Sequence, residues 1–339
     1  MKIDTALLAP TLDQIIPAAR KAEEIGFDGL WTSETQHNPM FPLVLAAEHT
    51  RRIELGTSIA VAFARSPMDT AYQAWDLAQF SQGRFILGLG TQVKAHIERR
   101  FSMPWGPPVP MLREYIHALR AIWRSWQTGE RLNFRGKFYK FTLMSPFFNP
   151  GPIDYPDIPI YIAGVNEGLC RLAGEVADGF HVHPLNSARY VRECVRPWIE
   201  AGARKAGRRL EDVAVSVTVF VVTGRDEAEM EKERESVRQQ IAFYASTPTY
   251  RTVLELHGWG DTAQELSRLA ARQRWDEMPR LITDEMLETF AVVAPRDRLA
   301  EAVKARYAGL ADRITYYAAF LEGDEDFWRE TVRAFKENQ

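Results

Sequence analysis

The residues best suited to acid–base chemistry follow a predicted strand in the run DGLWTSETQHNP. Glu34 stands where this strand ends, and His37 comes shortly after it. A carboxylate or an imidazole can exchange a proton with a substrate, and it does so best with a pKa near the working pH. Glu34 is therefore the leading candidate for proton transfer, with His37 as its assistant. A helix-capping or salt-bridging role is the alternative for Glu34.

A second candidate site lies in the run IYIAGVNEG. Ala163, Gly164, Val165 and Asn166 end a predicted strand, just before a predicted helix over Leu169–Ala177. Free backbone N–H groups at a helix N-terminus bind phosphate, and a glycine lets the phosphate approach the backbone closely. The pattern predicts a phosphate site here, and a simple turn is the alternative for Gly164.

Other patterns argue against two kinds of site. His181 and His183 lie on one predicted strand, and we expect only His183, nearer the strand end, to face the interior. A metal site needs further ligands at fixed spacing, and none is visible, which disfavours a metal-dependent hydrolase.

The sequence also disfavours a disulfide framework and a Rossmann fold. The two cysteines, Cys170 and Cys194, are too few for a disulfide framework. The run GLG at 88–90 is shorter than the dinucleotide-binding fingerprint, so a Rossmann fold is disfavoured.

Short apolar runs alternate with longer amphipathic stretches, which predicts parallel strands joined by helices. We expect eight strands, over Lys2–Ala9, Asp28–Ser33, Ile53–Ala62, Arg84–Gly90, Ile158–Ala163, Gly179–His183, Val213–Val222 and Arg313–Phe320. Helices are expected over Leu12–Ile25, Met68–Phe80, Met111–Trp126 and Phe327–Phe335. Eight β/α units in order predict an α/β fold, a (β/α)8 TIM barrel, whose site lies at the carboxyl ends of the strands.

Three segments interrupt this rhythm within what we expect to be one domain over residues 1–339. They lie near 101–110, a proline-rich loop, near 131–157, and near 247–288. The second contains NFRGKFYKF, which predicts a hairpin with Gly136 in its turn. Long insertions in a compact domain are often functional. Phe63, Trp105 and Phe147–Phe148 are expected to line an apolar substrate pocket.

The composition excludes several partners. The formal charge of -3 gives no strong field for nucleic acid or an anionic membrane. No apolar run reaches the ~18 residues that cross a bilayer, and the N-terminus has no signal-peptide core. We expect a soluble, cytoplasmic protein that acts on a small molecule.

Four stretches together resemble the luciferase-like monooxygenase superfamily: DGLWTSETQHNP, LGTSIAVAFARSP, GRFILGLGTQ and IPIYIAGVNEGLCRLAGEVADGF. The resemblance extends from Lys2 to about Phe320. The family includes monooxygenases that use FMN and oxidoreductases that use the deazaflavin coenzyme F420. The run GLGTQVKAHIERRF resembles the deazaflavin branch more closely. The resemblance implies hydride transfer between F420 and a small organic substrate, with an FMN-dependent monooxygenase or a non-catalytic flavin-binding barrel as alternatives.

The resemblance also assigns cofactor-binding residues. It implies a non-prolyl cis peptide between Ser58 and Ile59, in a backbone bulge at Ser58, Ile59 and Ala60 that supports one face of the ring. Thr91 and Gln92 would bind the edge of the ring. Deazaflavin enzymes of the family usually carry a histidine after the acidic residue, whereas this chain has Thr35 there. That departure leaves the family's proton relay in doubt for Glu34.

Three expectations complete the resemblance. The segment 163–166 would hold the phosphate of the cofactor, and His183 would lie beside the cofactor. The family also implies a homodimer, formed through helices of the second and third units. If Glu34 transfers the proton, its loss should reduce turnover much more than cofactor affinity.

Overall fold

Eight parallel strands close into a barrel in the computed structural model, which describes residues 1–7, 11–318 and 323–337. The strands are β1 (Lys2–Ala6), β2 (Gly29–Thr32), β3 (Glu54–Thr57), β5 (Phe85–Gly90), β8 (Ile160–Gly164), β9 (Gly179–Val182), β10 (Ala214–Val222) and β12 (Arg313–Tyr316). The barrel closes because β12 pairs with β1, where Asp4 stands in register with Thr315. This confirms the predicted TIM barrel. The expected strand ends at Leu8–Ala9 and Ala319–Phe320 lie outside the described residues.

The strands are buried on both faces, which is why their sequences are nearly continuous apolar runs. The third predicted strand is interrupted, however. It consists of β3 and the short β4 (Ala60–Val61), which both pair with β5, and Ser58 and Ile59 form a bulge between them. The peptide bond between Ser58 and Ile59 is cis, as predicted.

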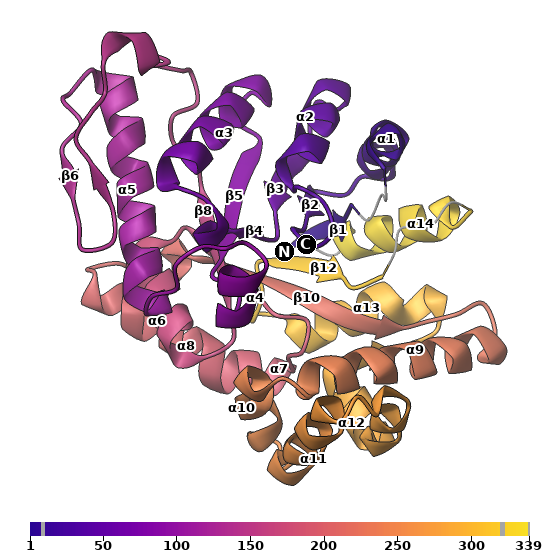
Figure 1. The fold of residues 1–339 in the computed structure, drawn as a ribbon. Helices are drawn as coiled ribbons and strands as arrows, with labels where there is room; N and C mark the ends of the chain where they lie inside the picture. The colour runs from indigo at the N-terminus through magenta and orange to yellow at the C-terminus, as the bar shows by residue number, and fades with distance from the viewer. Residues whose placement is uncertain (8–10, 319–322, 338–339) are drawn as a thin grey trace.

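Helices surround the barrel (Figure 1). They are α1 (Ile15–Ile25), α2 (Met40–His49), α3 (Pro67–Phe80), α5 (Pro108–Thr128), α6 (Glu167–Val176), α8 (Arg196–Lys205), α13 (Leu299–Tyr307) and α14 (Glu325–Lys336). Gly26 ends α1 with a φ of 101°, a conformation that glycine adopts without steric cost. The loop that we expected over 101–110 ends earlier, because α5 begins at Pro108. Proline is tolerated in the first turn of a helix.

The other insertions carry structure of their own. Strands β6 (Phe134–Arg135) and β7 (Lys140–Phe141) form the predicted hairpin, and the N–H of Gly136 donates to Tyr139. The chain between β10 and β12 contains α9 (Glu227–Ala245), α10 (Arg251–Glu255), α11 (Gly260–Ala271), α12 (Asp284–Phe290) and β11 (Ala291–Val293). These helices lie together beside one side of the barrel mouth (Figure 1). Strand β11, which pairs with β10, was not predicted.

A charged network fills the amino-terminal end of the barrel. The Arg313 guanidinium bonds both oxygens of Asp4, at 2.7 and 2.8 Å, and Glu54 at 2.5 Å. Trp31 donates its indole N–H to Asp4 at 3.0 Å. Burial raises the pKa of Asp4, and the neighbouring Arg313 opposes that shift. A Cβ at Gly29 would lie 2.5 Å from Arg313, so glycine is needed beside this network.

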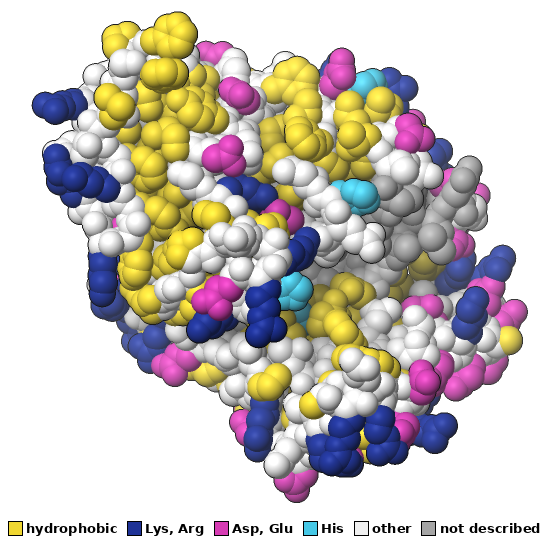
Figure 2. Space-filling model, in the orientation of Figure 1, with side chains coloured by type: hydrophobic (Ala, Val, Ile, Leu, Met, Phe, Trp, Pro, Cys, Tyr) yellow, Lys and Arg dark blue, Asp and Glu magenta, His cyan; other side chains and the backbone are white. Residues whose placement is uncertain are grey.

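Apolar side chains are exposed on the face shown in Figure 2. Among the described residues, the exposed large apolar side chains include Phe41 on α2, Phe80 on α3 and Phe147 in the segment after the hairpin. The predicted homodimer stays a prediction. No helix within the described residues has the length and apolar character required to cross a membrane.

Candidate active site

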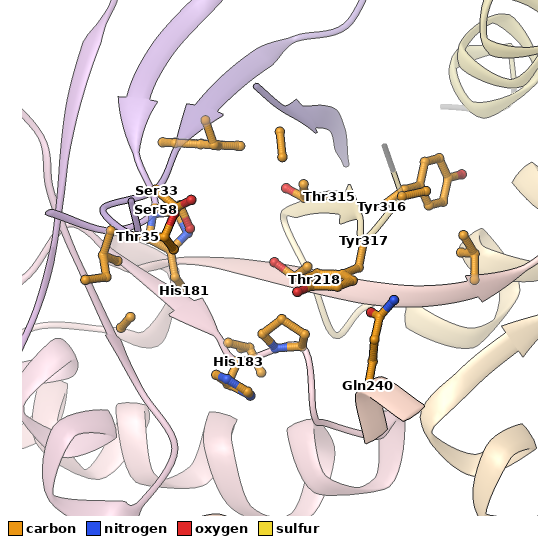
Figure 3. A pocket seen from close by; sticks show the side chains of 18 of the residues that line it. Ser33, Thr35, Ser58, His181, His183, Thr218, Gln240, Thr315, Tyr316 and Tyr317 are labelled. Atoms are coloured by element: carbon orange, nitrogen blue, oxygen red, sulfur yellow. The ribbon is translucent and has the colours of Figure 1, made fainter. Parts of the chain in front are cut away.

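A cavity of about 1010 Å³ opens at the carboxyl ends of the barrel strands. Its lining includes residues that end or follow each of the eight strands, together with residues of α9 and of the segment 247–250. Figure 3 shows side chains from opposite sides of the barrel pointing into this space. Eight of the predicted site residues line it: Ser58, Ile59, Thr91, Gln92, Ala163, Gly164, Val165 and His183. Four do not: Glu34, His37, Ala60 and Asn166.

The bulge at Ser58–Ile59 depends on two glycines of β5. A Cβ at Gly88 would lie 1.8 Å from the carbonyl oxygen of Thr57, and a Cβ at Gly90 would lie 2.6 Å from the Ile59 side chain. Thr57 also binds Gly88 with its hydroxyl, which accepts from the Gly88 N–H at 2.9 Å. The GLG run therefore brings β5 close to the bulge and fixes its position.

Glu34 clamps this bulge instead of lining the cavity. Its carboxylate accepts hydrogen bonds from Arg65 at 2.6 and 2.9 Å and from the N–H of Val61 at 2.7 Å. The N–H of Glu34 donates to Ile59 at 3.1 Å, and Arg65 also donates to the carbonyl of Val61 at 3.2 Å. The Glu34 and Arg65 side chains are 7% and 12% exposed. Protein donors occupy both carboxylate oxygens, which is the arrangement expected for the salt-bridging alternative.

His37 is exposed and also lies outside the cavity lining. Ser33 and Thr35, on either side of Glu34, do line the cavity. The carbonyl of Thr35 accepts a hydrogen bond from Arg100, which follows the short helix α4 (Lys94–Arg99). The loop after β2 therefore contributes hydroxyl groups to the cavity and no titratable one.

The inner end of the cavity is formed by Trp31 and His181, whose rings meet edge to face at 4.9 Å. Burial, together with the nearby charge of Arg313, lowers the pKa of His181 to about 3, so this imidazole is neutral. The expectation that only His183 faces the interior is wrong, since both histidines line the cavity. Residues two apart on a strand share a face.

His183 is fixed as a neutral hydrogen-bond donor. Its ring lies 4.7 Å from that of Tyr244 and 4.3 Å from that of Tyr250. The N–H of Leu185 donates to Nδ1 at 3.1 Å, and burial lowers the pKa of His183 to about 3. A neutral imidazole that accepts through Nδ1 carries its proton on Nε2. His183 therefore offers one N–H for hydrogen bonding.

The predicted phosphate segment divides into two parts. Ala163, Gly164 and Val165 line the cavity just before α6, where the first N–H groups of a helix lack intrahelical acceptors. Gly164 is explained by packing, because a Cβ there would lie 2.6 Å from Leu169. Asn166 binds the insertion instead, since its amide donates to the carbonyl of Thr249 at 3.0 Å and accepts from Thr252 at 2.9 Å.

The aromatic lining differs from the one expected. Phe63 is buried against Trp105, and Phe147 and Phe148 are exposed away from the lining. The aromatic residues of the cavity include Tyr250 and Tyr317, which sequence reasoning did not select. Their signal was weak, because Tyr250 lies in the insertion and Tyr317 follows the last strand.

Charged side chains line the part of the cavity beside the start of α9. There Arg225 pairs with Glu229, and Arg296 with Asp324 at 2.9 Å.

Ala60, the last of the residues expected to support the ring, is fully buried. Among the described residues, no three or more His, Cys, Asp or Glu side chains gather in a way that could hold a metal ion.

Comparison with known proteins agrees with this geometry. A family model described as luciferase-like monooxygenase matches residues 1–313. An uncharacterized protein of Mycobacterium tuberculosis is 52% identical over 88% of this chain and 87% of its own length. The 5,10-methylenetetrahydromethanopterin reductase of Archaeoglobus fulgidus is 28% identical over 83% of this chain and 82% of its own.

A solved structure also matches the whole barrel. It is a coenzyme F420-dependent tetrahydromethanopterin reductase from Methanopyrus kandleri, with a TM-score of 0.79 and 23% identity, over 98% of this chain and 96% of that one. At this identity the likeness shows the fold alone.

Proposed function

Because the chain belongs to the luciferase-like monooxygenase family, we propose that it is an oxidoreductase that transfers hydride between coenzyme F420 and a small organic substrate. The observation that carries the proposal is the cavity of about 1010 Å³ at the carboxyl ends of the strands. Its volume is at the upper end of small-molecule pockets, which leaves room for a tricyclic ring and a substrate together. Similarity to a putative coenzyme F420-dependent oxidoreductase of Mycobacterium tuberculosis, 27% identical over 82% of this chain and 83% of its own length, supports the choice of cofactor.

The residues present fit such a ring. The Ile59 side chain packs over Gly90 and presents an apolar surface to the cavity, while Ser58 supplies a hydroxyl beside it. The backbone before α6 offers N–H groups for a phosphate, and His183 directly follows the adjacent strand β9. Thr91 and Gln92 also line the cavity, and they would bind the edge of the ring.

Within the mechanism, the bound cofactor would supply the two-electron hydride chemistry, and the protein would supply binding, orientation and exclusion of water. The Glu34–Arg65 clamp holds the bulge that supports the ring. Trp31 and neutral His181 close the inner end of the cavity without adding charge. Proton exchange must therefore come from another wall of the cavity.

Oxygen consumption separates the proposed deazaflavin enzyme from an FMN-dependent monooxygenase. A deazaflavin has carbon where a flavin has the reactive ring nitrogen, and it reacts poorly with oxygen. We expect purified protein with reduced FMN to consume oxygen no faster than reduced FMN alone, as measured with an oxygen electrode. Protein-dependent consumption that is coupled to oxygenation of an added aldehyde or ketone would overturn the proposal and favour the monooxygenase.

A further inference from the structure

We propose that Tyr317, paired with Tyr244, exchanges a proton with the oxygen of the substrate, and that the substrate is an alcohol or the corresponding ketone. This inference rests on the proposed function, because it names the substrate class and the proton donor for the same hydride transfer. Neither tyrosine belongs to the residues that resemblance or sequence pattern singled out.

The position of Tyr317 is fixed by the barrel. It directly follows β12, and its N–H donates to the carbonyl of Val219 on β10 at 2.8 Å. Its ring packs edge to face on Phe220 at 5.0 Å, and Phe220 is fully buried. The side chain lines the cavity, where Figure 3 shows it between the Ser58 side of the barrel and Gln240.

Tyr244 prepares the Tyr317 hydroxyl for proton exchange. The two phenolic oxygens lie 2.7 Å apart and share one hydrogen bond. Burial and this hydrogen bond raise the pKa of Tyr244, which therefore stays protonated. When Tyr244 donates to Tyr317, the proton of Tyr317 is left for a ligand in the cavity. Tyr244 does not itself line the cavity, so it acts through Tyr317.

The other titratable groups of the cavity are less suited to this role. His181 and His183 are both neutral, with pKa values lowered to about 3 by burial. Among the described acidic residues of the lining, Glu229 and Asp324 are bound by arginines. Burial raises the pKa of Glu233, but this residue lies in the charged part of the cavity, near the start of α9. Tyr250 and Tyr316 also line the cavity, but Tyr317 is the tyrosine of the lining whose hydroxyl is hydrogen-bonded to a second phenol, and Figure 3 shows it inside the cavity.

Gln240 points to the class of ligand. It projects from α9 into the cavity, and its side-chain oxygen is buried without a hydrogen-bond partner. A buried acceptor without a partner is costly, so rotation of the Gln240 amide toward a bound ligand that donates a hydrogen bond would stabilise this oxygen. A hydroxyl group can donate to Gln240 and accept from Tyr317, whereas a ketone can accept from Tyr317 alone. The site therefore fits an alcohol–ketone pair.

The step balances in both directions. In ketone reduction, a hydride from the reduced deazaflavin forms the new C–H bond, and the proton of Tyr317 forms the O–H bond. The ketone gains two electrons and the deazaflavin is oxidised. The Tyr317 phenolate that remains accepts the hydrogen bond of Tyr244 and regains a proton from solvent. Alcohol oxidation is the reverse.

The test compares three probes of one shape: para-fluoroacetophenone, the alcohol 1-(para-fluorophenyl)ethanol and para-fluoroethylbenzene. Their binding is measured by fluorine NMR with the full protein, alone and with F420. We expect the ketone and the alcohol to bind the unmodified protein about tenfold more tightly than the hydrocarbon, since each gains a hydrogen bond. Tyr317→Phe should abolish this difference, and Tyr244→Phe should reduce it.

Tyr72→Phe is the matched control, because it removes a hydroxyl that bonds the carbonyl of Phe148 outside the cavity. It should keep the full preference. An equal preference in Tyr317→Phe and in the unmodified protein would overturn the proposal, as would no preference in the unmodified protein. The proposed function fails on a different result, the absence of F420 binding, which leaves the probe comparison unchanged.

Discussion

Replacing Arg313 with methionine is expected to lower the free energy of unfolding by about 3–5 kcal/mol. Arg313 is 3% exposed and bonds Asp4, which is fully buried, as well as Glu54. Although burial acts to lower it, the pKa of Arg313 is raised by Asp4 and Glu54, which keeps the guanidinium charged. The methionine would leave the Asp4 carboxylate buried without its cation.

The measurement is equilibrium unfolding in denaturant. Lys2→Met provides the control, because it removes another cation that bonds Glu54, at 2.7 Å, from an exposed position. That change should cost at most about 1 kcal/mol, as for other surface ion pairs. Arg313→Met combined with Asp4→Asn should recover part of the loss. A loss in Arg313→Met no larger than in Lys2→Met would contradict the role given to the network.

Replacing Arg65 with methionine is expected to weaken deazaflavin binding at least about tenfold. Arg65 holds both oxygens of Glu34, and Glu34 in turn holds Ile59 in the bulge and Val61 on β4. Without the arginine, the buried carboxylate lacks its counter-ion, and the bulge loses its fixed position. The surface that would support the ring is then no longer held in place.

The dissociation constant for F420 measures this effect, and a melting curve shows that the variant is folded. Asp69→Asn is the control, since Asp69 lies 4.0 Å from Arg65 and its side chain is 56% exposed. Asp69→Asn should leave the affinity for F420 within about twofold.

Glu34→Gln distinguishes a positioning role of Glu34 from a catalytic one. Loss of a positioning residue affects cofactor affinity and turnover together, whereas loss of a catalytic residue affects turnover alone. Unchanged affinity in Arg65→Met would contradict the clamp.

The barrel could be predicted from the sequence because its strands are apolar on both faces and its helices repeat at helical spacing. Strand β5 has the sequence FILGLG and is fully buried, so its short apolar run predicts a strand. Strand β11 has three residues, two of them buried, and follows α12 directly, so no turn signal separates it. The family resemblance indicated the segments 58–59 and 91–92, and the strand-to-helix pattern indicated 163–165; all three line the cavity.

The partners of charged and polar side chains could not be predicted in the same way. Glu34 lies 31 residues from Arg65, and Tyr244 lies 73 residues from Tyr317. Whether a carboxylate lines the cavity or binds an arginine depends on such pairs, which only the closed barrel brings together. For this reason the sequence alone could not show that the Glu34 carboxylate binds Arg65 and lies outside the cavity lining.

A side-by-side titration with oxidised F420 and oxidised FMN, followed by quenching of tryptophan fluorescence, tests the central claim most directly. Trp31 lines the cavity and makes the signal sensitive to a bound ring. We expect F420 to bind at micromolar concentration or below, and FMN at least about tenfold more weakly. Tighter binding of FMN would contradict the deazaflavin assignment and favour the monooxygenase. Binding of neither would contradict the roles given to Ser58, Ile59 and the segment 163–165, and would leave only the barrel.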